Sequence, residues 1–392
     1  MTQISMDIKK VSSNPAFLDI KNYSVFFVYL IVNSLFVIKY GENYIIPLLS
    51  GYLVMVSGIS ILYIKINLKD IVYKLFFVVG VILFFLFSIY LNYNVDGNSL
   101  NVDRWSAMEI GIKAIFNGQY PYNIPDHMGR ESSNLPMLIV LGMPFYLLFG
   151  SVGYLQPFTF LFFTFLIFKI FSYYRQRLAV LILLFLSPSY LWEVYVKSDL
   201  FSNFMIITGF VYLIWRKFLK MKIMKLEIVS FLSALVLLTR FSSVIPLTIL
   251  LIKKFFEFSG KEKLRFIAVF IFTISALGYI FFHNAPNLEV FLEHNPLIIQ
   301  GAKQPLILSL SYIGIACILS FRVKSFYDTI FWIGILLFIC VFVPFIMFFF
   351  EYGYTNMIKN SFFDLSFFNM CMPFVIITVI LEMFKNHNKE IK

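Results

Sequence analysis

Long apolar runs separated by short polar connections recur along almost the whole chain of 392 residues. A helix needs about 20 apolar residues to cross a hydrocarbon core of about 30 Å. The fold we expect is all-α, a polytopic transmembrane helical bundle with about twelve crossings in one integral membrane domain, 1–392. The predicted spans are 24–39, 43–64, 74–92, 154–173, 178–191, 199–215, 226–240, 241–252, 264–282, 305–321, 327–350 and 361–383.

The apolar run from Leu135 to Gly150 does not fit this series of full crossings. Pro136, Gly142 and Pro144 interrupt it, and counting it as a crossing would reverse the side of every later loop. As a re-entrant or interfacial helix, it leaves most of the 32 lysines and arginines on one face. Because positive loops stay in the cytoplasm, we predict that both termini are cytoplasmic.

Composition supports a membrane protein and excludes an ordinary soluble domain. The chain is 60% hydrophobic and only 14% charged, whereas a soluble domain is nearer one quarter charged. The net charge of +11 is explained by cytoplasmic loops, so we expect membrane lipids and no nucleic acid as partners. We place the protein in a bacterial inner (plasma) membrane.

Polar residues gather in a few connections on the predicted outer face. The two longest are 93–134 and 283–304, and a third polar segment runs from Glu351 to Ser361. Long loops on one face predict a functional site there. Arg240 lies between two half-length apolar runs, where an unpaired cation is costly, so we expect it to meet an anion.

Asp103 precedes a predicted amphipathic interfacial helix in the first long outer loop. From Trp105 to Phe116, apolar residues recur at helical spacing and polar residues take the other face. Asp103 is therefore either the N-cap of this helix or a reactive carboxylate, and capping does not exclude catalysis. Asp96 precedes Gly97 and is either a turn residue or a second carboxylate beside Asp103.

Two further groups have a structural and a functional interpretation. Gly118 and Pro121 predict the end of the helix, and the neighbouring Tyr120 and Tyr122 suit an interfacial belt or the edges of a sugar site. Farther along, three charged residues lie close to apolar runs at the end of a hairpin. They either pair with each other and cap the next helix or form the floor of an outward cavity: Glu193, Lys197 and Asp199.

No soluble type of metal or nucleotide site is predicted. His127, His283 and His294 lack the i, i+4 spacing of a zinc site, and no Gly-rich phosphate loop is present. A divalent metal is left open as a cofactor, with no ligand set assigned.

An acidic residue after an early span, an amphipathic helix and then Gly-x-x-Pro-Tyr together resemble the first outer loop of the GT-C superfamily of integral membrane glycosyltransferases. The matching residues are Asp103, the helix from Trp105 to Phe116, and Gly118 with Pro121-Tyr122. The likeness continues through Asn134-Leu-Pro-Met137, Phe149-Gly150, Ser187-Pro188 before Asp199, and Leu238-Thr-Arg240 followed by Pro246. In order of elements it covers roughly residues 74–255.

The resemblance implies transfer of a sugar from a polyprenyl-phosphate donor to a glycan or lipid acceptor on the outer face, with inversion. Asp103 would be the general base, with Asp96 as a helper, and Arg240 and Lys197 would hold the donor phosphate. Further expected substrate contacts are Arg104, Tyr120, Tyr122, Asn134, Glu193 and Asp199. Two features depart from the family: two spans precede the one that leads to the acidic loop, and no soluble C-terminal domain follows.

Two other classes stay open as alternatives. A polysaccharide polymerase or ligase of the O-antigen or capsule type tends to carry several arginines in its large outer loops, whereas 283–304 offers only Lys303 with His283 and His294. A flippase or transporter for a lipid-linked sugar predicts mid-span charges and an internal repeat. No repeat is visible, although Arg240 and Asp199 count in favour of this class.

Overall fold

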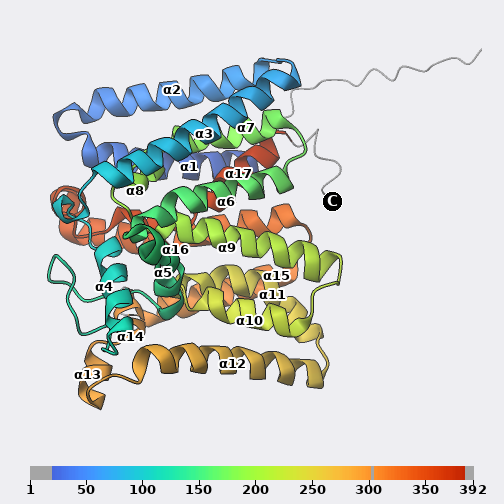
Figure 1. The fold of residues 1–392 in the computed structure, drawn as a ribbon. Coiled ribbons are helices and arrows are strands. Elements are labelled where there is room, and N and C mark those ends of the chain that lie inside the picture. The colour runs from blue at the N-terminus through green and yellow to red at the C-terminus, as the bar shows by residue number, and fades with distance from the viewer. Residues whose placement is uncertain (1–19, 302–303, 385–392) are drawn as a thin grey trace, which may run out of the picture.

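The computed structural model describes residues 20–301 and 304–384, and within these residues the chain is helical with no strand (Figure 1). The α-helices are α1 Ile20–Tyr40, α2 Ile45–Lys65, α3 Asp70–Asn94, α4 Arg104–Phe116, α5 Pro136–Phe149, α6 Leu155–Ile170, α7 Tyr174–Phe185, α8 Pro188–Tyr195, α9 Leu200–Ile214, α10 Leu226–Leu237, α11 Val244–Glu257, α12 Gly260–Phe282, α13 Leu288–Glu293, α14 Pro296–Gly301, α15 Leu306–Arg322, α16 Phe326–Tyr354 and α17 Met372–Met383. Short 3-10 or π segments flank several of them, including η2 Gly97–Ser99, η3 Val152–Tyr154, η5 Phe241–Ser243, η6 Thr355–Lys359 and η7 Leu365–Met370. The all-α prediction is confirmed.

Several of these helices have the length and composition of membrane spans. Five continuous stretches qualify, and seven do if each of two bent helix pairs counts as one span. The five are Glu42–Lys65, Asp70–Asn94, Val152–Ile170, Gly260–Phe282 and Phe326–Lys359. These lengths indicate a membrane protein, whereas the number of about twelve crossings remains a prediction.

The outermost helices expose large apolar side chains. Ile46 on α2 is 79% exposed and Phe272 on α12 is 74% exposed. Apolar surface of this extent is unfavourable in water but costs nothing against lipid tails. The exposed faces of α2, α3 and α12 therefore suit contact with hydrocarbon.

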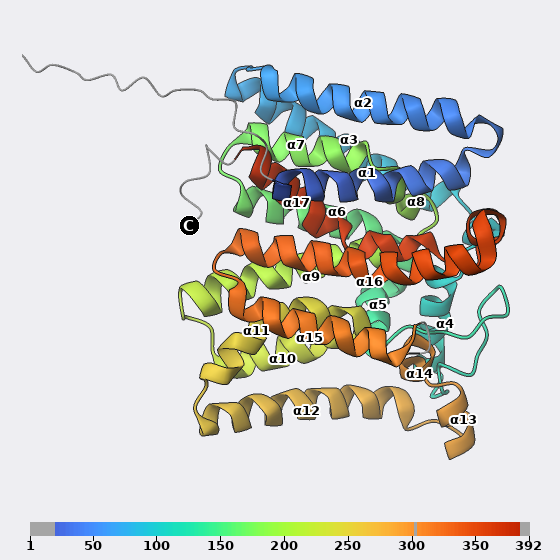
Figure 2. The ribbon, with the colours of Figure 1, turned by 180° about the vertical axis from the view of Figure 1, so that it is seen from behind.

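Figures 1 and 2 show the long helices lying side by side, with the longer connections gathered at one end. We call this the loop end; it holds α4, α13 and α14, with the segments 95–134, 196–199, 238–243, 283–301 and 355–371. The short turns after α2, α6, α9, α11 and α15 lie at the opposite end. The loops predicted on the outer face thus share one end, while the predicted cytoplasmic terminal residues fall largely outside the described residues.

Helix α5 corresponds to the apolar run from Leu135 to Gly150, which did not fit the predicted series of full crossings. It has 14 residues, begins with a proline, and ends at Gly150 in the left-handed conformation with φ 78°. In Figure 1, α5 lies near the loop end at an angle to the long helices. This geometry agrees with an interfacial or re-entrant helix better than with a full crossing.

Two predicted spans differ from the observed helices. The range 178–191 bends by 67° between α7 and α8, because Ser187 caps α8 and Pro188 occupies its first turn. The range 361–383 is helical in the α sense only from Met372, since Ser361 has φ 57° and a 3-10 segment follows it. Because the segment before Met372 is not part of a long helix, Asp364 lies at the loop end and not inside a membrane span.

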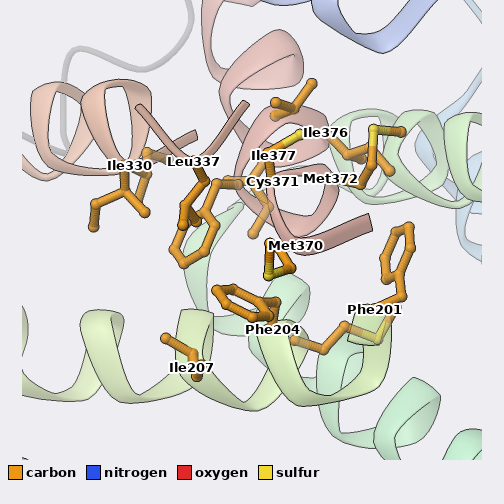
Figure 3. Packing of buried hydrophobic residues seen from close by; sticks show 14 of the residues in the cluster. Phe201, Phe204, Ile207, Ile330, Leu337, Met370, Cys371, Met372, Ile376 and Ile377 are labelled. Carbon is orange, nitrogen blue, oxygen red and sulfur yellow. The ribbon is translucent and has the colours of Figure 1, made fainter. Parts of the chain in front are cut away.

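The core of the bundle forms where α9, α16 and α17 meet (Figure 3). Phe201 and Phe204 of α9, Ile330 and Leu337 of α16 and Ile376 of α17 belong to this cluster, and all of them are fully buried. Close packing of this kind holds helices together where the solvent is itself apolar. It fixes the first turn of α9, which carries part of the polar site described next.

Candidate functional site

Helix α4 forms close to the predicted position, from Arg104 to Phe116, but its polar face is not solvated. Ser106 and Glu109 are both buried. Ser106 Oγ lies 2.6 Å from His127 Nδ1, and Glu109 Oε1 accepts the N–H of Val152 at 3.0 Å. The expectation of an amphipathic surface helix is therefore wrong for the first turns, because the loop and η3 cover the polar face. Burial raises the pKa of Glu109, and the hydrogen bond from Val152 opposes this shift.

The predicted stop after α4 is confirmed in detail. Gly118 has φ 66°, its N–H bonds the carbonyl of Ile115 at 3.1 Å, and the N–H of Gln119 bonds Ala114 at 2.8 Å. This pair of bonds is the Schellman motif, which requires a left-handed residue that glycine supplies at no steric cost. It turns the chain back over α4.

The burial of Tyr120 and Tyr122 does not fit an interfacial belt, and their place at a sugar site stays a prediction. Both are buried in a small hydrophobic cluster with α4, α5 and the end of α12. The Tyr120 hydroxyl donates to the carbonyl of His294 at 3.2 Å, and Tyr122 stacks on Phe282. These rings hold the first and second outer loops together, which removes them from an interfacial belt.

Asp103 stands at the N-cap position of α4 but makes no side-chain capping bond. Its carboxylate pairs with Arg130 at 3.1 Å, with 28% of the Asp103 side chain and 60% of the Arg130 side chain exposed. The turn at Asp126 sets this arrangement, because its carboxylate accepts the N–H of Arg130 at 3.0 Å. The sequence analysis did not identify Arg130.

Asp96 adopts the turn interpretation. Its carboxylate accepts the N–H of Asn98 at 3.0 Å and caps the 3-10 segment η2. Asp103 and Asp96 thus carry different local bonds, so a shared role for the two carboxylates has no support from these contacts.

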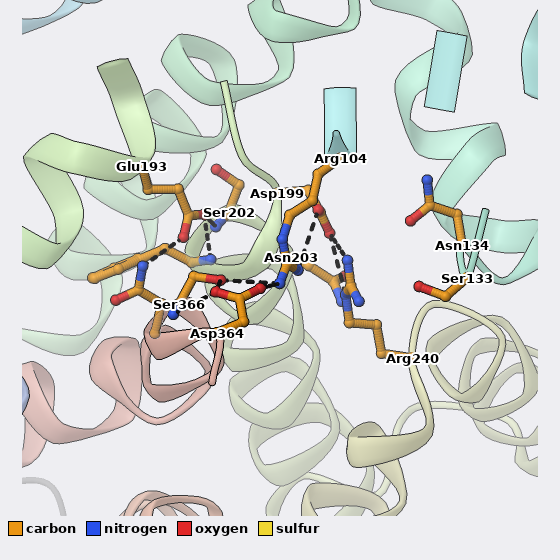
Figure 4. A network of polar contacts seen from close by, with 12 residues as sticks. Arg104, Ser133, Asn134, Glu193, Asp199, Ser202, Asn203, Arg240, Asp364 and Ser366 are labelled. Atoms are coloured by element: carbon orange, nitrogen blue, oxygen red, sulfur yellow. Dashed lines mark hydrogen bonds and ion pairs between the residues drawn. The ribbon is translucent and has the colours of Figure 1, made fainter. Parts of the chain in front are cut away.

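The expectation that Arg240 meets an anion is confirmed. Its Nη2 and Nε donate to Asp199 Oδ2 at 2.6 and 3.2 Å, and both side chains are almost fully buried. Arg104 approaches the other oxygen, with Nη1 3.9 Å from Asp199 Oδ1. Figure 4 shows Asp199 between the two guanidinium groups. One carboxylate from the start of α9 is therefore shared by α4 and by the turn before η5.

Arg104 is held from its other side by the segment before α17. Its Nη2 lies 2.5 Å from Asp364 Oδ2 and 2.9 Å from Ser366 Oγ, and the ring of Phe367 lies 5.2 Å from its guanidinium carbon. Burial acts to raise the pKa of Asp364, but Arg104 and Ser366 outweigh it and lower the pKa to about 2. Asp364 is thus ionised at neutral pH.

Glu193 serves as the cap of α9. It is completely buried, and its Oε1 accepts the N–H groups of Phe201 and Ser202, the latter at 3.2 Å. Its Oε2 accepts the side-chain amide of Asn369 at 2.7 Å. A carboxylate at a helix N-terminus also benefits from the helix dipole. The structure therefore gives Glu193 a structural role that ties α8, α9 and η7 together.

Lys197 does not pair with Asp199. Its Nζ donates to the carbonyl of Asn92 at 3.0 Å and thereby caps the C-terminal turn of α3. Burial lowers the pKa of Lys197, while nearby Glu109 opposes this effect. The two cations predicted for one phosphate thus lie in different clusters, and only Arg240 belongs to the network around Asp199.

Buried polar atoms without partners line the region beside Arg240. Asp199 Oδ1, Asn203 Oδ1 and Asn134 Nδ2 have no hydrogen-bond partner among the described residues. All three residues are at least nine-tenths buried, and Asn134 lies across from Arg240 in Figure 4. A buried polar atom left unpaired costs about 1–3 kcal/mol, so a ligand that supplies hydroxyl groups would relieve this cost.

An apolar cavity of about 290 Å³ opens between α10, α11 and α12. Leu237 and Val244, two of its lining residues, flank the turn that carries Arg240. Its walls continue toward the opposite end of the bundle through Leu251, Phe255 and Phe266. Arg240 itself does not line the cavity, whose walls are mainly apolar side chains of α10, α11 and α12.

No cluster of three or more potential metal ligands occurs among residues 20–301 and 304–384. Asp199 and Asp364 both lie beside Arg104, and each of the two carboxylates pairs with a guanidinium group. The arrangement as it stands suits an anion and hydroxyl groups better than a cation.

Asp364, Ser366 and Asn369 are the main site residues that the sequence analysis missed. The signal was present, because a charged Asp364 inside a predicted span is unusual and marks a functional or boundary position. Comparisons of the chain with protein-family models, with curated proteins and with solved structures gave no match.

Proposed function

We propose that the protein is a membrane glycosyltransferase that transfers a sugar from a polyprenyl-phosphate donor to an acceptor on the extracytoplasmic face. The loop end would be that face, and the helices would cross the bilayer about twelve times in a GT-C-like arrangement. The acceptor would be a glycan or a lipid. The proposal includes Asp103 as the general base.

One observation carries this proposal. A buried arginine, Arg240, lies beside three buried polar atoms that lack partners, and only one carboxylate oxygen binds it directly. A phosphodiester attracts a guanidinium group, and sugar hydroxyls both donate and accept hydrogen bonds. A phosphate-linked sugar therefore matches both unsatisfied features of the site.

The neighbouring cavity supports a lipid-linked donor over a soluble one. Because Leu237 and Val244 flank the Arg240 turn in the chain, we infer that a lipid chain attached to a phosphate at Arg240 would extend toward this cavity. An isoprenoid chain is apolar throughout and matches the lining. A soluble nucleotide sugar would gain nothing from these walls.

The proposed reaction forms one bond and breaks one. The acceptor oxygen attacks the anomeric carbon of the donor sugar while the bond from that carbon to the phosphate oxygen breaks. Asp103 takes the hydroxyl proton, and the electron pair stays on the phosphate, which leaves as polyprenyl phosphate. Arg240 stabilises the negative charge that develops there. The partial exposure of Asp103 suits a group that must meet an acceptor.

A flippase for the same lipid is the second candidate. The Arg240–Asp199 pair, buried inside the bundle, favours it because binding of a phosphate does not by itself require transfer. The two candidates differ in what Asp103 does, since a flippase needs no general base.

The test measures the rate at which the purified protein transfers sugar from a panel of polyprenyl-phosphate sugars. We expect Asp103→Asn to lower turnover by about 10²–10⁴-fold, the usual contribution of a general base, without changing folding or donor binding. Asp96→Asn is the matched control, because it alters a carboxylate in the same loop that only caps a turn. Lipid movement without sugar transfer, or wild-type turnover in Asp103→Asn, would contradict the proposal.

A further inference from the structure

We propose that Asp364 occupies the place of the donor phosphate on Arg104, so that an incoming lipid phosphate displaces this carboxylate to bind both arginines. The inference rests on the proposed function. It adds a second phosphate-binding residue, Arg104, and a resident anion that competes for it.

The charges around Arg104 and Arg240 favour such a displacement. Arg104 and Arg240 are paired with Asp199 and Asp364, so the charges of these four groups sum to zero, and the nearby Glu193 adds no positive charge. Adding a phosphate to a neutral, water-poor cluster would leave a negative charge uncompensated, which is costly. Removing one carboxylate from the arginines leaves one positive charge, which matches a phosphodiester with one negative charge.

Asp199 and Asp364 differ in how easily each can leave. Asp199 is only 3% exposed, binds Arg240 through two nitrogen atoms and lies at the packed start of α9. The Asp364 side chain is 44% exposed and lies in the connection between η6 and η7. Rotation of its side chain toward solvent would free Arg104 and would also break the bonds from the Ser366 N–H and hydroxyl, through which Asp364 caps η7. Asp364 is therefore the carboxylate that exchanges.

A second cation lies ready to accept the displaced carboxylate. Lys39, next to the end of α1, is close enough to Asp364 for the two charges to interact. Arg104 would meanwhile keep the hydroxyl of Ser366 and the ring of Phe367 as neighbours. The guanidinium is thus held in position while its charged partner changes.

The test measures binding of a polyprenyl phosphate methyl ester, a phosphodiester with one negative charge and no sugar, to the full-length protein in lipid nanodiscs. We expect Asp364→Asn to bind this lipid about three- to tenfold more tightly, because the competing charge is gone while the Ser366 contact remains. Glu351→Gln is the matched control, since it neutralises an exposed carboxylate near the end of α16, and its affinity should equal that of the wild type. Lys39→Met should bind about two- to threefold more weakly, because Asp364 loses its second partner.

The outcomes separate this inference from the function on which it rests. Wild-type binding together with unchanged or weaker binding by Asp364→Asn would overturn the inference and leave the proposed function standing. Failure of the wild type to bind the lipid would overturn both. Unfolding temperatures show whether each variant is folded; if Asp364→Asn is not, Lys39→Met decides, and wild-type affinity in that variant overturns the inference.

Discussion

Two aspartate–arginine pairs in this protein have the same chemistry and opposite surroundings. Asp199 and Arg240 are 3% and 6% exposed, whereas Asp103 and Arg130 are 28% and 60% exposed. Water screens the attraction between the charges of the exposed pair. Little water reaches the buried pair, so its attraction is weakened less. The buried pair is therefore a fixed part of the structure, whereas the exposed pair leaves the Asp103 carboxylate accessible to solvent.

The difference follows from where each aspartate lies in the chain. Asp199 precedes α9, whose first turn packs into the core through Phe201 and Phe204. Asp103 precedes α4, whose start faces an open loop that ends in Arg130. Both are N-cap positions without a side-chain capping bond. Equivalent positions at helix starts thus become an electrostatic anchor in one case and a candidate base in the other.

The largest predicted effect comes from breaking the buried pair. Arg240→Ala leaves Asp199 buried with only the distant contact to Arg104, and loss of one partner of a buried pair costs about 3–5 kcal/mol. We expect a matching decrease in the free energy of unfolding, measured by denaturant titration in detergent micelles. The double variant Arg240→Met with Asp199→Leu should lose less, because it buries no unpaired charge. If Arg240→Ala is as stable as the wild type, water reaches the Arg240–Asp199 pair and the pair is not buried as described.

A smaller effect is expected from acid. Because the pKa of Asp364 is lowered to about 2 from an ordinary value of 3.8, its contribution to stability is fully present above pH 4 and is lost as pH falls toward 2. Unfolding temperature measured across this window should fall less steeply in Asp364→Asn than in the wild type. Identical slopes would show that Asp364 does not pair with Arg104 in solution.

The smallest effect is expected from the exposed pair. Arg130→Gln should change the free energy of unfolding by less than about 1 kcal/mol, since exposed ion pairs contribute about 0–1 kcal/mol. Unfolding in high and low salt provides the check, because a screened pair loses most of its small contribution in high salt. A loss as large as that of Arg240→Ala would remove the contrast between the two pairs.

The sequence was informative where local rules decide the structure. Hydrophobic runs located the helices, and Gly118 with its neighbours specified the end of α4 because only a left-handed residue closes that turn. Arg240 was expected to find an anion because a bare cation in an apolar layer is too costly. These predictions depend on short stretches of chain and on the solvent, both of which are visible in a sequence.

Contacts between distant segments were not predictable in this way. Asp364 meets Arg104 across 260 positions of the chain, and no local pattern relates the two. Lys197 was assigned to a phosphate from the family resemblance, but a left-handed backbone with φ 56° directs it to the carbonyl of Asn92 instead. The belt position expected for Tyr120 and Tyr122 was wrong because neighbouring segments pack over both rings. Helix packing decided each of these positions.

The most direct test of this account is an experimental structure of the protein with a non-transferable analogue of a polyprenyl-phosphate sugar. The account predicts the phosphate within hydrogen-bond distance of Arg240, the sugar near Asn134 and Asn203, and the Asp103 carboxylate open to the same space. A donor analogue bound elsewhere, or an Asp103 separated from Arg240 by packed helices, would contradict it.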